Sequence, residues 1–331
     1  MRRRWHRVAR AAAGLGILLV LLTGMAAADQ SRERAGRHSI ALGTYIPEVG
    51  EHPARIDRYA RLMGRRPAIV GYYKQWDYRP FDAEELEGVW RHGAVPMVTW
   101  EPMSYHGHRY SLKGIARGRY DRYVRAAARA AADWGRPLFV RFAHEMNGDW
   151  YPWGLGFDGN TPHRFKVAWR RVVRIFRSAG ADNVRWVWTP NANQFGGLPF
   201  KRFYPGDRWV DWVGLDGFNW GYGGRSYSLR QLFVSSSRTL ARISSHPMMI
   251  AETGTYNRRK ARWIAQALGH QLPGLRNIRA LVWFNQAANG IDLRFNSSRA
   301  SARAFRAGAR AGRYDATREQ LLRVVDDGRP R

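Results

Sequence analysis

The sequence predicts an α/β fold consisting of a single (β/α)8 TIM barrel. Its 331 residues suit one barrel domain, which typically needs about 250 residues. Short apolar or alternating segments recur along the chain, and most of them are separated by amphipathic helical segments. Because parallel strands need crossovers of about a dozen residues or more, this alternation indicates a parallel sheet, which closes into a barrel when eight units are present.

Eight segments have the length and apolar content of buried strands. The barrel domain is expected at residues 40–313, after a flexible polar lead-in at residues 29–39 and before a C-terminal tail at residues 314–331. The predicted strands are Ile40–Tyr45, Ala68–Tyr73, Val95–Trp100, Leu138–Phe142, Val184–Trp188, Trp212–Leu215, Met248–Ala251 and Ala280–Trp283.

Helix-start patterns lie between most of these strands. Asp82 is a predicted N-cap, and Glu85 completes a capping box with it. Thr161-Pro162 and Ser228 open two further helices. The weakest link follows the fifth strand, where residues 194–204 contain Gly and Pro and predict at most a short irregular helix.

The N-terminus has the pattern of a secretory signal. Five arginines lie in the first ten residues, Ala11 to Gly24 carry no charge, and Met25-Ala26-Ala27-Ala28 precedes Asp29. We therefore expect a signal peptide at residues 1–28, cleaved after Ala28, and a secreted, extracellular protein. The apolar stretch is short for a membrane span, which needs about 20 residues. An uncleaved N-terminal anchor is the alternative.

Composition limits the possible functions. The absence of cysteine excludes disulfides, thiolate nucleophiles and Cys-based metal sites. Lys and Arg number 55 against 26 acidic residues, and a net charge of +29 raises the question of a nucleic-acid partner. The arginines are scattered over the predicted helices instead of forming one stripe, so no nucleic-acid partner is predicted. Affinity for an acidic cell-envelope polymer stays open, and a monomer is expected.

Polar and aromatic residues gather at the predicted carboxyl ends of the strands, where the chemistry of this architecture takes place. Glu145 follows the fourth strand, with three aromatic residues just beyond it, and Glu252 ends the seventh. Aromatic faces beside carboxylates suit sugar rings. A salt-bridged core glutamate beside a packed Trp-rich loop is the structural alternative. The expected substrate-binding residues are Glu101, His144, Trp150, Trp153, Asn191, Asp216, Asn219, Trp220 and Trp283.

Four of these residues are tryptophans that should face the sugar-binding groove, with Trp283 nearest the cleaved bond. The two glutamates should point into the barrel from opposite sides, about 5–5.5 Å apart, which is the separation of a retaining glycosidase. His144 and Asn219 are the candidates for holding these groups and a substrate hydroxyl.

Histidine does not predict a metal site here. His106-Gly107-His108 follows the third strand and His144 follows the fourth, but the chain has no His-Glu-x-x-His pattern. No Gly-x-Ser-x-Gly elbow or phosphate-binding Gly loop occurs either. We therefore expect neither a metal nor another cofactor.

The motifs resemble glycoside hydrolase family 26, the secreted β-mannanases and related β-glycanases of a large TIM-barrel clan. The resemblance covers about Ile40 to Ala311. It implies that Glu145 is the acid/base and Glu252 the nucleophile of a retaining endo-β-glycosidase acting on β-1,4-mannan or glucomannan. It is carried by Arg141–Gly148, Trp150–Gly154, Val213–Gly221 and Ala251–Gly254.

Two positions depart from the family pattern. The mannanases carry a substrate-binding His at the end of strand three, where this chain has Trp100-Glu101-Pro102, which is closer to mixed-linkage glucan hydrolases of the family. A Tyr near the end of strand six commonly bonds the nucleophile, whereas the aligned residue here is Phe218, with Tyr222 as a substitute. A β-1,3-1,4-glucanase or other β-glycan hydrolase is therefore an alternative. A carbohydrate-binding barrel with weak catalysis and a basic scaffold without chemistry are two further alternatives.

Overall fold

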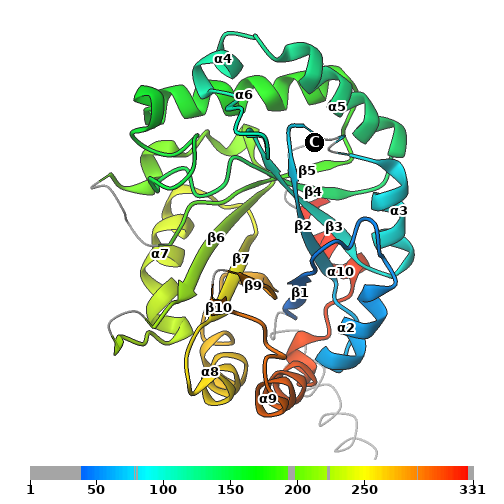
Figure 1. Ribbon diagram of the computed structural model, residues 1–331, viewed down its shortest axis with the longest axis vertical. Coiled ribbons are helices and arrows are strands. Elements are labelled where there is room, and N and C mark those ends of the chain that lie inside the picture. The colour runs from blue at the N-terminus through cyan, green and yellow to red at the C-terminus, as the bar shows by residue number, and fades with distance from the viewer. Residues whose placement is uncertain are drawn as a thin grey trace, which may run out of the picture. The chain divides into compact units, whose positions relative to one another are not determined.

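The computed structural model shows a closed barrel of eight parallel strands that lie in chain order (Figure 1). It describes residues 39–326, except 78, 80, 193–197, 222–223 and 289. The expected signal peptide and all of the lead-in but Ser39 lie outside the described residues. The TIM-barrel prediction is confirmed. The strands are β1 (Ala41–Tyr45), β2 (Ile69–Gln75), β3 (Val95–Glu101), β4 (Leu138–Phe142), β5 (Val184–Trp188), β6 (Trp212–Asn219), β7 (Met248–Thr255) and β8 (Ile278–Trp283).

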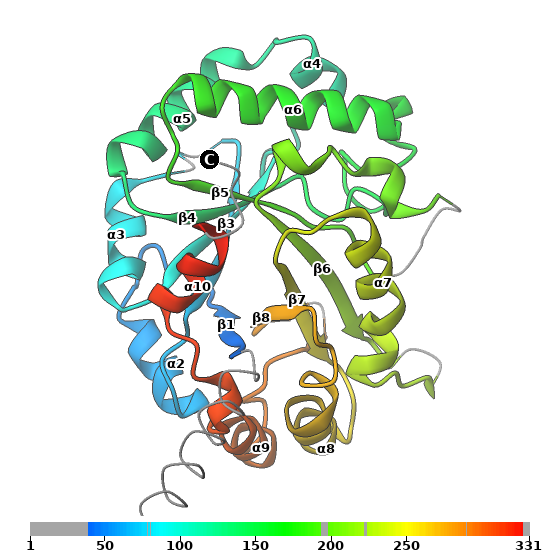
Figure 2. The ribbon, with the colours of Figure 1, turned by 180° about the vertical axis from the view of Figure 1, so that it is seen from behind.

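Helices surround the barrel, as the front and back views show (Figures 1 and 2). The described residues of the crossover between β5 and β6 form only the 3-10 turns Phe200–Phe203 and Asp207–Trp209, in keeping with the irregular segment expected there. None of the helices within the described part of the chain is long and apolar enough to cross a membrane. The helices are α2 (Arg55–Met63), α3 (Ala83–Arg91), α4 (Leu112–Ala116), α5 (Asp121–Trp134), α6 (Pro162–Ser178), α7 (Leu229–Ile243), α8 (Lys260–Gln266), α9 (Arg299–Ala309) and α10 (Arg318–Asp326), and the short strands β9 (Ala287–Ala288) and β10 (Ile291–Asp292) form a hairpin after β8.

The predicted helix starts are confirmed, with one correction. The side chains of Thr161 and Ser228 cap α6 and α7 by accepting from backbone amides. Asp82 caps α3 in the same way, with Oδ1 2.9 Å from the amide nitrogen of Glu84. The expected capping box does not form, because the Glu85 carboxylate pairs with Lys74 Nζ at 2.6 Å instead of returning to the cap.

The barrel interior continues past the expected domain boundary at residue 313. Tyr314 is fully buried. Leu321, on α10, is buried among apolar side chains inside the barrel, including Ala41 and Val95 at the start of their strands. The amphipathic C-terminal helix therefore closes the amino-terminal end of the barrel, and the opposite end, the barrel mouth, is left for the site.

Four strands extend further toward the barrel mouth than the apolar pattern predicts. They are β2, β3, β6 and β7, which end at Gln75, Glu101, Asn219 and Thr255. All four terminal residues are polar and buried. Because these residues are polar, a prediction from hydropathy ends each strand before them. Their backbones nevertheless continue the hydrogen bonding between strands, so the sheet carries polar side chains into the mouth.

Candidate active site

The turn that follows β4 places Glu145 at the barrel mouth. Two of its non-glycine residues have left-handed backbones, Ala143 at φ 45° and Glu145 at φ 52°. Such conformations cost on the order of 1–3 kcal/mol each and persist only where the surroundings enforce them. Here the amide of Glu145 donates to the carbonyl of Thr189, the residue that follows β5, over 2.8 Å. The turn is thereby fixed to the neighbouring strand.

Neutral donors hold the Glu145 carboxyl from two sides. Asn191 Nδ2 lies 2.6 Å from Oε1, and Trp150 Nε1 lies 2.7 Å from Oε2. The backbone of Asn191 is bonded in both directions by the Asn147 side chain, at 2.9 and 3.0 Å. Gly148 is needed because a Cβ there would lie 2.3 Å from the Trp150 ring. Residues that follow Glu145 closely in sequence thus position the two side chains that donate hydrogen bonds to it.

Burial, followed by the negative charge of Glu252, raises the pKa of Glu145 to about 7. The hydrogen bonds from Asn191 and Trp150 and the charge of Arg141 act in the opposite direction and are outweighed. A carboxyl group with such a pKa is protonated in a large fraction of molecules near neutral pH, as a general acid must be.

Glu252, within β7, receives charged and phenolic donors. Arg141 Nη2 and the Tyr73 hydroxyl both donate to its Oε1. Arg141 also donates to Asp216 Oδ2 at 2.5 Å and to Thr99 Oγ1 at 2.9 and 3.1 Å. Burial alone would lower the pKa of this guanidinium, but the charges of Asp216 and Glu252 hold it well above its usual value. A permanently charged group therefore orients the Glu252 carboxylate.

Tyr73 was not among the sequence-based candidates. It comes from β2, whereas a tyrosine near the end of strand six was expected. Phe218 on β6 packs against Phe284 at 5.6 Å between ring centroids, and Tyr222 lies outside the described residues. Burial and the Glu252 charge raise the pKa of the Tyr73 phenol well above its usual value, so it remains a donor. The sequence signal for Tyr73 is its place between Gly71 and Gln75, because these alternate residues lie on one face of the strand.

We expect Tyr73→Phe to lower kcat by roughly 10- to 100-fold, because a hydrogen bond to a charged group contributes about 1.5–3 kcal/mol. KM should change little if the bond orients the nucleophile and does not bind substrate. Tyr72→Phe is the matched control, since the Tyr72 hydroxyl is buried without a hydrogen-bond partner among the described residues. Equal kcat for the two variants would show that the Tyr73 hydroxyl has no part in turnover.

His144 and Asp216 are both fully buried beside this pair. His144 Nε2 lies 3.2 Å from the Tyr151 hydroxyl. Burial and then the charge of Arg141 lower the pKa of the imidazole far below its usual range, so the ring is neutral. Burial also raises the pKa of the Asp216 carboxyl, against the opposing charge of Arg141. The expected contact of Asp216 with substrate is wrong in this geometry, because its side chain is closed off from the mouth by burial and by its ion pair.

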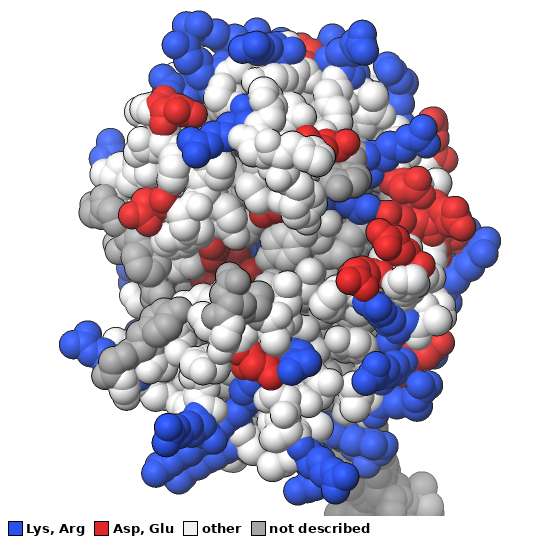
Figure 3. Space-filling view, viewed as in Figure 1, with Lys and Arg blue, Asp and Glu red and all other residues white. Residues whose placement is uncertain are grey.

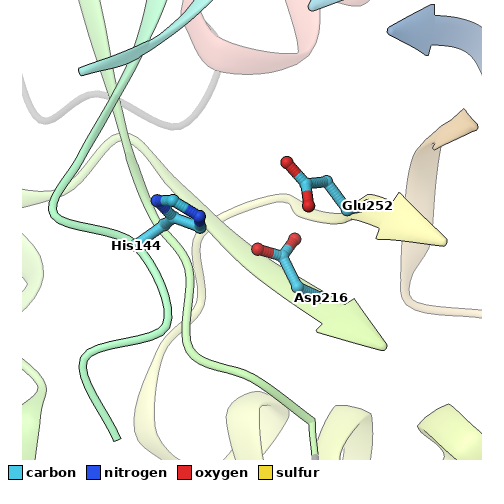
Figure 4. Close-up of side chains that lie close together, drawn as sticks. All are labelled: His144, Asp216 and Glu252. Carbon is cyan, nitrogen blue, oxygen red and sulfur yellow. The ribbon is translucent and has the colours of Figure 1, made fainter. Parts of the chain in front are cut away.

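His144, Asp216 and Glu252 converge from the turn after β4, from β6 and from β7 (Figure 4). Their potential ligand atoms lie within 4.8 Å of one another, which is close enough for a metal ion. The Arg141 guanidinium, however, donates to both carboxylates. A divalent cation would compete with this fixed positive charge for the same oxygens, so the donor set is poorly suited to a metal.

The structure separates the four expected groove tryptophans into two groups. Trp150 is 37% exposed and reaches Glu145, and the half-buried Trp220 packs on Phe218, at 4.8 Å between centroids. Trp153 is buried, stacks on Tyr151 at 4.5 Å and donates to the His144 carbonyl. The expectation that Trp153 faces the groove is therefore wrong, since it supports the turn from behind.

Trp283 is also wrongly placed by the sequence interpretation. It is buried, its Nε1 donates to the Leu293 carbonyl at 2.9 Å, and its ring contacts Phe305 of α9 edge-on. The next residue, Phe284, is the one that faces inward, where it stacks on Tyr45 at 5.0 Å. Trp283 therefore packs between the barrel and the helices and does not face the barrel interior.

We expect Trp283→Ala to lower the free energy of unfolding by about 3–5 kcal/mol, because it deletes a large buried ring. Denaturant unfolding measures this loss. Trp283→Phe keeps an aromatic ring in the same place and should retain near-normal turnover. A Trp283→Phe variant with native stability but little activity would show that the Trp283 indole is part of the active site.

The remaining predicted residues have clear positions. Asn219 is fully buried, and its side chain bonds Thr255 Oγ1 at 2.9 Å, Ser226 Oγ at 3.2 Å and the amide of Tyr227 at 2.9 Å. The expectation that it holds the substrate 2-hydroxyl is wrong, because the loop before α7 uses its hydrogen-bonding groups. Glu101 is buried at the end of β3, beside the mouth.

Comparison with known proteins agrees with this geometry. The family model described as glycosyl hydrolase family 26 matches residues 116–268, which include both glutamates. Over 285 residues the sequence is 34% identical to Endoglucanase H of Acetivibrio thermocellus, covering 81% of this chain and 30% of that protein. The chain belongs to glycoside hydrolase family 26.

Other known proteins are similar over shorter stretches or in fold. A mannan endo-1,4-beta-mannosidase of Bacillus subtilis is 26% identical over 202 residues, or 50% of this chain and 54% of the relative. A modular endo-beta-1,4-mannanase from Cellulomonas fimi superposes with a TM-score of 0.66 at 18% identity, covering 87% of this chain and 74% of that one. At that identity the superposition shows the fold. The chain spans 30% and 54% of the lengths of the two curated relatives.

Proposed function

We propose that this chain is a retaining endo-β-glycosidase that hydrolyses a β-linked hexose polysaccharide. The observation that carries the proposal is that two glutamates in one barrel mouth have different hydrogen-bond donors around them. Glu145 has neutral donors and a pKa raised to about 7, first by burial. Glu252 has a guanidinium and a phenol on one oxygen. Two nearby carboxyl groups with such different surroundings are typical of an acid paired with a nucleophile.

In this mechanism the Glu252 carboxylate attacks the anomeric carbon while Glu145 protonates the departing glycosidic oxygen. The products are a free polysaccharide end and a glycosyl ester on Glu252. Glu145, now a carboxylate, takes a proton from water as that water attacks the same carbon and releases Glu252. Two displacements at one carbon retain the β configuration.

For the substrate, the first candidate is β-1,4-mannan or glucomannan, which the names of the Bacillus and Cellulomonas relatives support. The second candidate is a mixed-linkage β-1,3-1,4-glucan. It is favoured by Glu101 at the end of β3 and by the similarity to an endoglucanase across most of this chain.

Reducing-sugar release from mannan, glucomannan, lichenan and β-1,3-xylan tests the proposal. The wild type should act on at least one polymer, with products of several lengths early in the reaction, and Glu252→Ala should act on none. Binding of a polymer without cleavage would favour a carbohydrate-binding barrel. Neither binding nor cleavage would favour a scaffold.

The N-terminal pattern supports secretion, with a mature chain that begins at Asp29. N-terminal sequencing of the secreted protein tests this, and an intact Met1 in a membrane fraction would indicate an anchor. Figure 3 shows Lys and Arg side chains around most of the edge of this face, while acidic side chains gather at its right-hand edge and are also recessed in a central hollow. This distribution supports an acidic cell-envelope polymer as a second partner of a monomeric enzyme, and salt-dependent retention on isolated envelopes is the measurement.

A further inference from the structure

A carboxylic acid and an amide lie side by side above the catalytic layer of the barrel. Gln75 and Glu101 are the last residues of β2 and β3, and they are register partners in the sheet. Tyr73 and Thr99, two residues earlier on the same strands, bond Glu252 and Arg141 inside the barrel. Because strand side chains alternate, Gln75 and Glu101 also point inward, about 6.6 Å nearer the mouth.

This pair has unused hydrogen-bonding capacity in a nearly buried place. Each residue is only 4% exposed. A side-chain hydrogen bond joins Gln75 to Glu101. Among the described residues, the buried Gln75 Oε1 has no hydrogen-bond partner. A buried acceptor without a donor is costly, and in an enzyme mouth it indicates a place where a ligand supplies the donor.

The groups around Glu101 favour its neutral form. Glu252 of β7 and Arg141 of β4 face it with opposite charges, and Tyr45 and Tyr151 are neutral phenols nearby. No cation forms an ion pair with Glu101 in the described part of the chain. Burial, supported by the Glu252 charge, raises the pKa of Glu101 to about 8, against the Gln75 hydrogen bond and Arg141.

We infer that Gln75 and Glu101 together bind one sugar hydroxyl of the substrate, and that Glu101 does so as a neutral acid. The inference rests on the proposed glycosidase function. A hydroxyl can accept the Glu101 O–H and donate to Gln75 Oε1 at the same time. An ionised Glu101 has no proton to donate, so the hydroxyl would lose one of its two bonds. The pair binds and positions sugar but takes no part in bond cleavage.

The test measures oligosaccharide binding in Glu145→Gln, which cannot turn over substrate efficiently and no longer titrates at position 145. Glu145 is not among the groups that shift the pKa of Glu101, so the pair should be unaffected. Calorimetric affinity for mannohexaose and for a β-1,3-1,4-glucan hexasaccharide is followed from about pH 5.5 to 9.5. The affinity should be constant up to pH 7 and fall through a midpoint near 8, approaching roughly tenfold per pH unit.

Two variants at position 101 separate this role from a structural one. Glu101→Gln, added to Glu145→Gln, keeps a donor of the same shape and should give a flat profile near the low-pH affinity. Glu101→Ala should bind at least tenfold more weakly at every pH, without a midpoint. Glu84→Gln changes an exposed carboxylate and should leave the midpoint in place.

A flat profile with Glu101 present, or an unchanged midpoint in Glu101→Gln, would overturn the inference. If the wild type cleaves a glycan while the profile is flat, the inference alone fails. If the protein neither binds nor cleaves any of the glycans, the proposed function fails and the hydroxyl-binding pair fails with it.

Discussion

Glu252→Ala is expected to lower kcat on the polysaccharide by about five orders of magnitude, because removal of a covalent nucleophile eliminates the first displacement altogether. The Glu252 carboxylate also accepts hydrogen bonds from Arg141 and Tyr73, and the methyl group of alanine can accept neither. Asp216, the other carboxylate on Arg141, is fully buried and cannot reach a sugar.

The variant must be shown to be folded before this loss is assigned to chemistry. Arg141 keeps its bonds to Asp216 and Thr99 in Glu252→Ala, so circular dichroism and oligosaccharide binding should remain close to wild type. A folded Glu252→Ala protein that retains more than about one percent of wild-type kcat would exclude Glu252 as the nucleophile.

Glu145→Ala is expected to lower kcat by about 10² to 10⁴, the usual contribution of a general acid–base group. On an activated aryl glycoside the leaving group needs no acid, so the glycosyl-enzyme still forms. Azide should then restore turnover and yield a β-glycosyl azide, because a small anion can replace the missing base in the second step. Absence of an azide adduct, with the protein folded, would place the acid/base elsewhere.

The pH dependence of the wild type follows from the same group. Glu145 must be protonated to donate, and its pKa is about 7, so kcat/KM should be lost as pH rises through that value. In Glu145→Ala with the activated glycoside, this alkaline limb should disappear. Asn191→Ala removes a hydrogen bond that lowers the pKa, and it should therefore move the limb to higher pH.

The sequence could predict the fold because the strands and crossovers repeat with a regular period, and it could place both glutamates at the barrel mouth because each follows an apolar segment. It could not show which inward residues meet across the barrel. Tyr73 and Glu252 are 179 residues apart, and nothing local to either indicates their contact. Arg141 appeared only as part of a motif, although it joins two carboxylates.

The errors at Trp153, Trp283 and Asn219 have a common cause. Each has the residue type that binds sugars, but orientation depends on the register of the strand or turn. A shift of one residue along a strand moves a side chain to the opposite face of the sheet, and the inward ring is accordingly that of Phe284. For Asn219, β6 continues beyond the apolar segment that hydropathy predicts. The side-chain amide of Asn219 therefore lies inside the protein, where it helps to hold the loop before α7.

The stereochemistry of the first product tests the central claim that Glu252 and Glu145 act as nucleophile and acid/base. Proton NMR of the anomeric signals during the first minutes of hydrolysis distinguishes the two outcomes before mutarotation mixes them. The assignment predicts that the β anomer forms first and that the α anomer appears only later. An α-configured first product would mean a single displacement by water, and Glu252 would then be a base instead of a nucleophile.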